Sequence, residues 1–204
     1  RAGCCLSPRR LRLVALSAAS PLRMDNTVAL AVAGYAFTTW HTLRAEQRRN
    51  RVARLNDQLQ SLYGPLLACV HASKSAFDAM VMQHSPDGTE EGLRSAVRAA
   101  PDGPQAQAYR EWCTEVFRPL NERAAELVIT RADLLEGGEI FPELLQLVAH
   151  VSAMRVILKR WDDREYSATS VVAFPNKLTE LVRREYVRLK RSQAAENGTS
   201  ISRA

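Results

Sequence analysis

Apolar residues recur at spacings of three and four along most of the chain, the pattern of helices that pack one face against a core. Four stretches show this pattern: residues 52–83, 105–135, 141–163 and 176–193. Because each stretch has one regular apolar face, we expect the four to share a single core. The sequence therefore predicts an all-α fold, a four-helix-type bundle with kinked helices, preceded by an N-terminal hydrophobic helix.

Proline and glycine mark the irregular points of this pattern. Gly64-Pro65 interrupts the first stretch and Pro119 the second, so we expect kinks or helix breaks there. Residues 84–105 form a loop rich in proline and glycine, with a short helix at 89–99 that Thr89 opens. Residues 171–174 lie in a linker before the last helix and could extend across the bundle. Asn176 is the expected cap of that helix.

The N-terminal helix is predicted from residues 26–43, which carry no charge. As a helix, this stretch spans roughly 27 Å, close to the apolar thickness of a thin bilayer. A basic cluster follows it directly, and such a cluster faces phospholipid headgroups or a partner. We expect a single-pass membrane anchor with the C-terminal domain on the cytoplasmic, stroma or matrix side. The alternative is a buried or oligomerising helix of a soluble protein. The arginines of the cluster are Arg44, Arg48, Arg49, Arg51 and Arg54.

The two ends of the chain are expected to lie outside the fold. Residues 1–24 carry five arginines and no acid, which is the composition of an organelle transit peptide. The alternative is that they are not part of the mature protein, with Met24 as the start. Residues 44–193 then form the bundle domain, and residues 194–204 a flexible polar tail.

The net charge of +6 is unevenly distributed along the chain. Basic residues concentrate in the first 54 positions and in the last helix, whereas residues 85–145 are acidic overall, so the charge is a weak argument for nucleic-acid binding. Neither basic segment has interleaved aromatic residues for base stacking. A basic nucleic-acid-binding protein is therefore a less favoured alternative. Three arginines of the last helix join the candidate basic surface: Arg183, Arg184 and Arg188.

The sequence contains no recognisable catalytic constellation. No two of the four histidines have the spacing of metal ligands on one helix face, and no phosphate-binding loop or nucleophile motif occurs. Cys69 and Cys113 fall on apolar faces and are expected to be buried free thiols. We expect no metal and no cofactor, and we favour a non-enzymatic function.

One group of residues is nevertheless a candidate polar site for a bundle enzyme or a ligand-binding protein. His150 lies on the most apolar helix, where its ring needs a partner. A satisfied core histidine is the favoured interpretation, and a ligand or base the alternative. The candidate site consists of the polar or amphipathic residues nearest the predicted core and kinks: Tyr63, Asn121, Glu122, His150 and Trp161.

Four blocks of sequence resemble an uncharacterised, mostly bacterial family of small helical proteins, many with an N-terminal hydrophobic segment. The resemblance covers roughly residues 45–193 and implies a helical architecture, but no activity. Leu67 stands where an aromatic residue is expected in such relatives. The blocks are LNDQLQSLYGPLLA (55–68), EWCTEVFRPLNERAAELVITRADLLEG (111–137), PELLQLVAHVSAMRVILKRW (142–161) and FPNKLTELVRREYVRLKRSQ (174–193).

The function favoured by these features is that of a membrane-tethered interaction or scaffold module. The expected partners are a membrane and a protein of unknown identity, with a homo-oligomer as an alternative.

Overall fold

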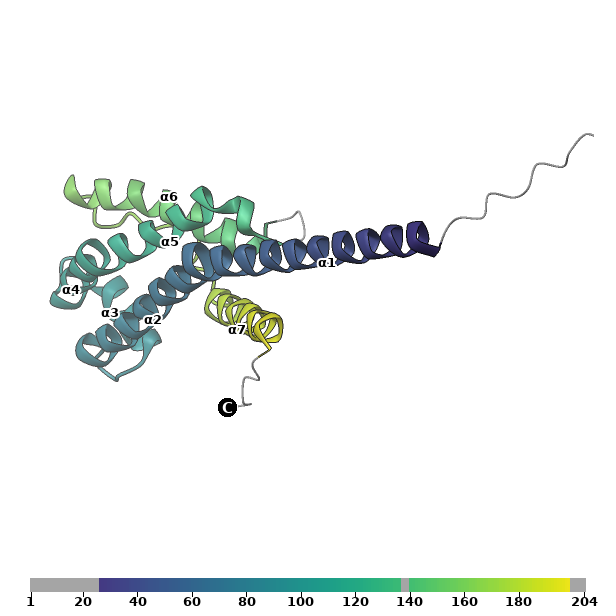
Figure 1. Ribbon diagram of the computed structural model, residues 1–204. Helices are drawn as coiled ribbons and strands as arrows, with labels where there is room; N and C mark the ends of the chain where they lie inside the picture. Colours follow the sequence, from purple (N-terminus) through teal and green to yellow (C-terminus); the bar gives the residue numbers. More distant parts are fainter. Residues whose placement is uncertain (1–25, 137–139, 199–204) are drawn as a thin grey trace, which may run out of the picture. The chain divides into compact units, whose positions relative to one another are not determined.

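The computed structural model describes residues 26–136 and 140–198, and within these ranges the regular elements are all helices (Figure 1). The contacts divide the chain into two compact units, one up to Ala45 and one from Glu46 onward. The predicted all-α class is confirmed. The predicted leader, residues 1–24, lies outside the described residues, as do Gly137 and Gly138.

Helix α1, Asn26–Asp57, supplies the described part of the first unit through residues 26–45 and enters the second unit with its last turns. Residues 44–51, which lie between the predicted helices at 26–43 and 52–83, are helical as well. By length and apolar character, no helix within residues 26–136 and 140–198 qualifies as a membrane-spanning segment. The hydrophobic helix predicted at 26–43 thus exists as a helix, but the expectation that it spans a membrane finds no support.

The first predicted helix of the bundle continues through Gly64-Pro65 without a break. A π-helical segment, η1 (Gln58–Tyr63), leads directly into α2 (Gly64–His84). The Gly64 amide donates to the Leu59 carbonyl five residues back, and Pro65, which has no amide hydrogen, follows in the first turn of α2. The expected kink is therefore a widened turn, in which one additional residue accommodates the proline.

The same solution recurs at Pro119. Helix α4 (Pro104–Trp112) passes through a second π-helical segment, η2 (Cys113–Phe117), into α5 (Arg118–Thr130). The Arg118 amide donates to the Cys113 carbonyl, again five residues back. A short 3₁₀ turn, η3 (Ala132–Leu134), follows α5, so the α-helix ends at Thr130, before the predicted end at residue 135.

Three smaller expectations have mixed outcomes. The short helix α3 (Glu90–Ala99) is confirmed, and the Thr89 hydroxyl caps it by accepting from the Gly92 amide at 2.9 Å. Asn176 does not cap the last helix, because α7 (Leu178–Asn197) begins after Lys177 without a side-chain cap. The tail expected from residue 194 is helical as far as Asn197. Gly198 ends α7 in the left-handed conformation, with φ of 71°.

The core of the second unit lies around α2. Helix α2 packs against both α5 and α7, and α5 in turn packs against α6, Pro142–Asp162 (Figure 1). Although residues 141–163 form the most apolar of the predicted helices, Leu145 and Val156 on α6 are more than half exposed. The predicted bundle is confirmed, with α2 and α5 at its centre. Its main core includes Leu62, Leu66, Val128, Leu147, Val182 and Leu189.

Candidate functional site

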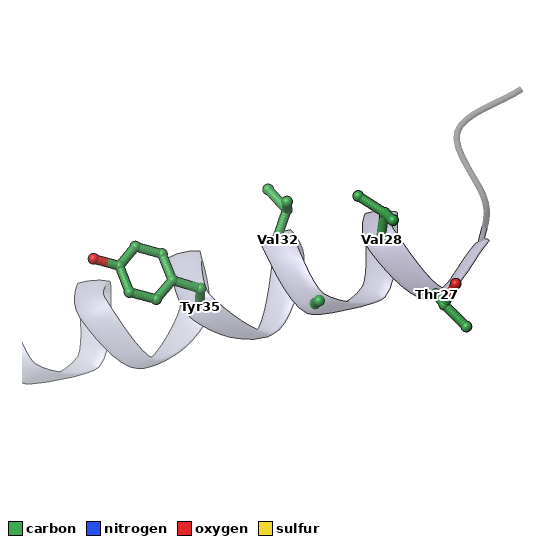
Figure 2. A pocket seen from close by; sticks show the side chains of 5 residues that line it. Thr27, Val28, Val32 and Tyr35 are labelled. Atoms are coloured by element: carbon green, nitrogen blue, oxygen red, sulfur yellow. The ribbon is translucent and has the colours of Figure 1, made fainter. Parts of the chain in front are cut away.

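The most unusual surface of the molecule is the apolar segment, residues 27–43 of α1. Seven large apolar side chains on it are about half exposed or more, and Leu30 and Tyr35 exceed 70%. Figure 2 shows Val28, Val32 and Tyr35 projecting from one side of this helix around a shallow depression. The seven side chains belong to Val28, Leu30, Val32, Tyr35, Phe37, Trp40 and Leu43.

These side chains project in several directions around the helix. Each residue of an α-helix is rotated by about 100° from the last, so Val28 and Leu30 point to nearly opposite sides. Val28, Val32 and Tyr35 share one side, whereas Leu30 and Phe37 share another. A helix that is apolar all round requires apolar surroundings on all sides.

The polar groups of the apolar segment are partly satisfied within the helix. The Thr38 hydroxyl donates to the Tyr35 carbonyl at 2.9 Å and approaches the Gly34 carbonyl at 3.1 Å. The Thr42 hydroxyl donates to the Thr38 carbonyl at 2.9 Å. Because these hydroxyls need no outside acceptor, they lower the cost of placing the segment in an apolar environment.

The C-terminal end of the apolar segment carries a group of aromatic and basic side chains. The Arg44 guanidinium lies over the Trp40 ring, 3.9 Å from the ring centroid. His41 packs edge-on against Trp40 and also contacts the Phe37 ring. No hydrogen bond to another side chain or to the backbone occupies the Trp40 indole, the His41 imidazole or the Arg44 guanidinium within the described residues.

The remaining arginines predicted to face lipid or a partner are mostly engaged within the second unit. Arg48 and Arg51 both bind Glu196 on α7, with an N–O distance of 3.2 Å for Arg51. Arg54 donates to the Asp133 carbonyl. Arg49 makes no such contact in the described part of the chain. The basic cluster predicted from the sequence therefore consists of two groups. Arg48, Arg51 and Arg54 contact other parts of the bundle, whereas Arg44 and Arg49 form no hydrogen bond or ion pair within the described residues.

The basic face of α7 is also largely paired. Arg183 lies 3.5 Å from Glu180, and Arg184 lies 3.4 Å from Glu185. Arg188 contacts Glu185 at 2.8 Å and Glu136 at 2.7 Å. Carboxylates this close reduce the positive potential that a nucleic acid would meet.

The five residues of the candidate polar site have separate environments, and no hydrogen bond or ring contact in the described part of the chain joins any two of them. Their individual partners are as follows. The Asn121 side-chain oxygen accepts a hydrogen bond from Ser73 at 3.1 Å, and Glu122 pairs with Arg155 at 2.8 Å. His150 lies 2.7 Å from the Val172 carbonyl and packs edge-on against Phe174. Trp161 donates to the Ala168 carbonyl at 2.9 Å, and Tyr63 is almost completely buried.

The contacts of His150 are those of a structural residue. Together with the Gln146 amide, which donates to the Ala173 carbonyl at 3.1 Å, this side chain holds residues 171–174 along α6. These contacts place residues 171–174 along α6, and the expected course across the bundle stays a prediction. The hollow beside Glu122, between α5 and α6, has a volume of about 190 Å³, below the usual size of small-molecule pockets.

A partly buried polar cluster that sequence reasoning missed surrounds Tyr63. The Gln58 cluster consists of Gln58, Tyr63, Glu136, Glu185 and Arg188. The Gln58 amide nitrogen donates to the Leu134 carbonyl at 2.7 Å, whereas its Oε1 is buried without a donor. Burial, reinforced by the Glu185 charge, raises the pKa of Tyr63 to about 12. The Tyr63 phenol therefore stays neutral at physiological pH.

The sequence did contain a signal for this cluster. Gln58 follows Leu55 by three residues and precedes Leu62 by four, so it lies on the apolar face. Glu185 holds the same kind of position between Leu181 and Leu189. A polar residue at a core position of a helical pattern needs a buried partner, and that requirement predicts a cluster.

The thiols show no sign of nucleophilic activation. Burial raises the pKa of Cys113 to about 12, and burial also raises the pKa of the half-buried Cys69. Both are free thiols. Cys4 and Cys5 lie outside the described residues. Within the described ranges, no group of three His, Cys, Asp or Glu side chains is placed to hold a metal ion.

In comparisons with known proteins, no family model, no curated protein and no solved structure matches the chain.

Proposed function

We propose that this protein is a membrane-associated helical interaction module. Its apolar segment, residues 27–43, enters a lipid surface, and the helical unit from Glu46 onward serves as a platform for a protein partner. The observation that carries the proposal is the run of seven large, exposed apolar side chains on the uncharged N-terminal part of α1. Each gains about 1.5–3 kcal/mol on full burial, so partial burial of all seven stabilises the bound state by roughly 5–10 kcal/mol.

A lipid surface accounts for the distribution of these side chains better than a protein groove does. A groove covers one stripe of a helix, such as Val28, Val32 and Tyr35, and leaves Leu30 and Phe37 in water. Lipid chains surround a helix and cover every side of it. The internal hydrogen bonds of Thr38 and Thr42 further reduce the cost of transfer into lipid.

The proposal does not require the segment to cross a bilayer. A helix that is too short or too polar to span can still be held at a membrane with its apolar part among the acyl chains and its basic end at the headgroups. This placement is compatible with the lack of a spanning helix among residues 26–136 and 140–198.

Vesicle flotation of the full chain tests the proposal. We expect the protein to float with phosphatidylcholine vesicles that contain 30% phosphatidylglycerol, and the double variant Leu30→Glu/Phe37→Glu to lose at least ten-fold in partitioning. The matched control is Val171→Glu, which adds a charge at a fully exposed apolar residue of the other unit. This control is expected to float like the wild type.

Two outcomes would overturn the proposal. One is a wild-type protein that stays at the bottom of the gradient with every vesicle. The other is a stable oligomer in the absence of vesicles that the double variant converts to monomer, because the apolar segment would then be covered by a second copy of the chain.

A further inference from the structure

We infer that the Trp40–Arg44 end of the apolar segment is a binding site for the phosphate group of anionic phospholipids. The inference rests on the proposed function and names the lipid class that it favours. The site comprises the side chains of Trp40, His41 and Arg44, which lie within about one turn of α1.

All three side chains offer hydrogen-bond donors that the described residues do not use. The indole of Trp40, the imidazole of His41 and the guanidinium of Arg44 have ring contacts with one another or with Phe37, but no hydrogen-bond acceptor among the described residues. The Trp40 ring covers one face of the guanidinium and leaves its N–H edges free. These edges match two oxygens of a phosphate group, a geometry that a lysine ammonium does not reproduce.

The order of side-chain types along α1 matches the change in polarity across one leaflet of a bilayer. Large apolar residues extend from Val28 to Phe37, Trp40 follows, and Arg44 comes last. At 1.5 Å per residue, Arg44 lies about 6 Å beyond Trp40 along the helix axis. Tryptophan favours the interface and arginine the phosphate level, so the spacing places each group at its preferred depth.

The structure also identifies a matched control on the same helix. Arg48 lies one turn after Arg44 and carries the same charge, but it is bound to Glu196. If only net charge matters, removing either arginine should weaken lipid binding equally. If Arg44 belongs to a phosphate site, its removal should have the larger effect.

Vesicle partitioning of the full chain separates these cases. With vesicles of phosphatidylcholine and 30% phosphatidylglycerol, we expect about five-fold weaker binding for Arg44→Gln, the effect of one interfacial charge of about 1 kcal/mol. We expect less than two-fold for Arg48→Gln and an intermediate loss for Arg44→Lys, which keeps the charge but not the planar fork. With pure phosphatidylcholine, whose phosphate charge is balanced by the choline cation, the differences among the four proteins should be smaller.

Each contrary result is assigned to one of the two proposals. Equal wild-type binding to both kinds of vesicle, or equal losses for Arg44→Gln and Arg48→Gln, overturns the phosphate site and leaves the membrane association standing. A wild-type protein that binds neither kind of vesicle overturns both. Circular dichroism of each variant confirms that the helical content is unchanged.

Discussion

The Gly64 amide donates to the Leu59 carbonyl, and a Cβ built on Gly64 would lie 2.5 Å from that same oxygen. The close approach results from the π-helical turn, which brings the carbonyl five residues back against the Gly64 Cα. Gly64 has an ordinary helical φ of −66°, so glycine is required here by space and not by backbone conformation. A larger residue must displace backbone, because the neighbouring atom is not the end of a flexible side chain.

Substitution of Gly64 by alanine is therefore expected to destabilise the protein by about 1–3 kcal/mol, in spite of the better helix propensity of alanine. Urea unfolding followed by circular dichroism measures the effect. The control is Gly34→Ala, where an added Cβ meets nothing within 4 Å and no loss is expected. Equal stabilities for Gly64→Ala and the wild type would show that the π-helical turn has room for a side chain.

Arg188 is expected to stabilise the Gln58 cluster because it neutralises Glu185, which is only 9% exposed. Arg188→Met should cost roughly 1–3 kcal/mol, since a buried carboxylate loses its closest donor. Adding Glu185→Gln should recover part of this loss. The comparison variant is Arg183→Met, whose exposed pair with Glu180 should contribute less than about 0.5 kcal/mol. Similar losses for the two arginine variants would contradict the role of burial.

Tyr63 is expected to make the stability depend on pH in the alkaline range. Its folded-state pKa of about 12 exceeds the ordinary value of 10.0, so the folded protein holds the phenolic proton more tightly than the unfolded chain. The contribution of the Tyr63 proton to the free energy of unfolding is fully present below pH 10. It is lost as the pH rises toward 12, by at most about 1.4 kcal/mol per pH unit.

The measurement is urea unfolding of the wild type and Tyr63→Phe between pH 8 and 11.5. The stability advantage of the wild type over the variant should be constant up to pH 9 and then shrink. Other buried groups of raised pKa, such as Cys113, contribute equally to both proteins and cancel in the difference. A difference that stays constant to pH 11.5 would show that Tyr63 titrates normally.

Cys113 is expected to resist thiol reagents in the folded protein. Burial and the raised pKa, about 12, leave almost no thiolate at pH 8. In a Cys4→Ser/Cys5→Ser background, Ellman's reagent should modify one thiol, Cys69, slowly in buffer and two thiols in urea. Adding Cys113→Ala should leave the reaction in buffer unchanged. Rapid modification of two thiols in buffer would indicate that η2 opens readily.

The sequence predicts the helices well, because their apolar periodicity is a local property. The stretch 141–163 matches α6, the stretch 52–83 lies within a longer helical run, and Thr89 marks the start of α3. The form of the interruptions at Pro65 and Pro119 was not predictable in the same way. A kink, a break and a π-helical turn can each accommodate a proline, which lacks an amide hydrogen. Only packing against the rest of the bundle selects one of them.

Partners distant in sequence account for the remaining differences. Arg48 and Arg51 look like part of an exposed basic cluster until Glu196, more than 140 residues later, is found beside them. Likewise, the apolar density of α6 did not reveal that α2 and α5 form the centre of the core. The residues of the candidate site around His150 were grouped by chemical type. Gln58 and Glu185 could instead be recognised by their position on an apolar helix face.

Each of the two π-helical turns holds one residue more than an α-helical turn would, just before Gly64 and just before Arg118. Deletion of one residue within η1 would convert it to an ordinary α-helical turn, and because the widened turn absorbs one extra residue, the later side chains of α2 would keep their orientation relative to α1. Leu66 and Val70 would then remain in the core. Length variation at these two points is thus coupled to the prolines: a homologous chain one residue shorter at η1 should also lack the proline, because the proline would otherwise stand inside an ordinary α-helix and clash with the preceding turn.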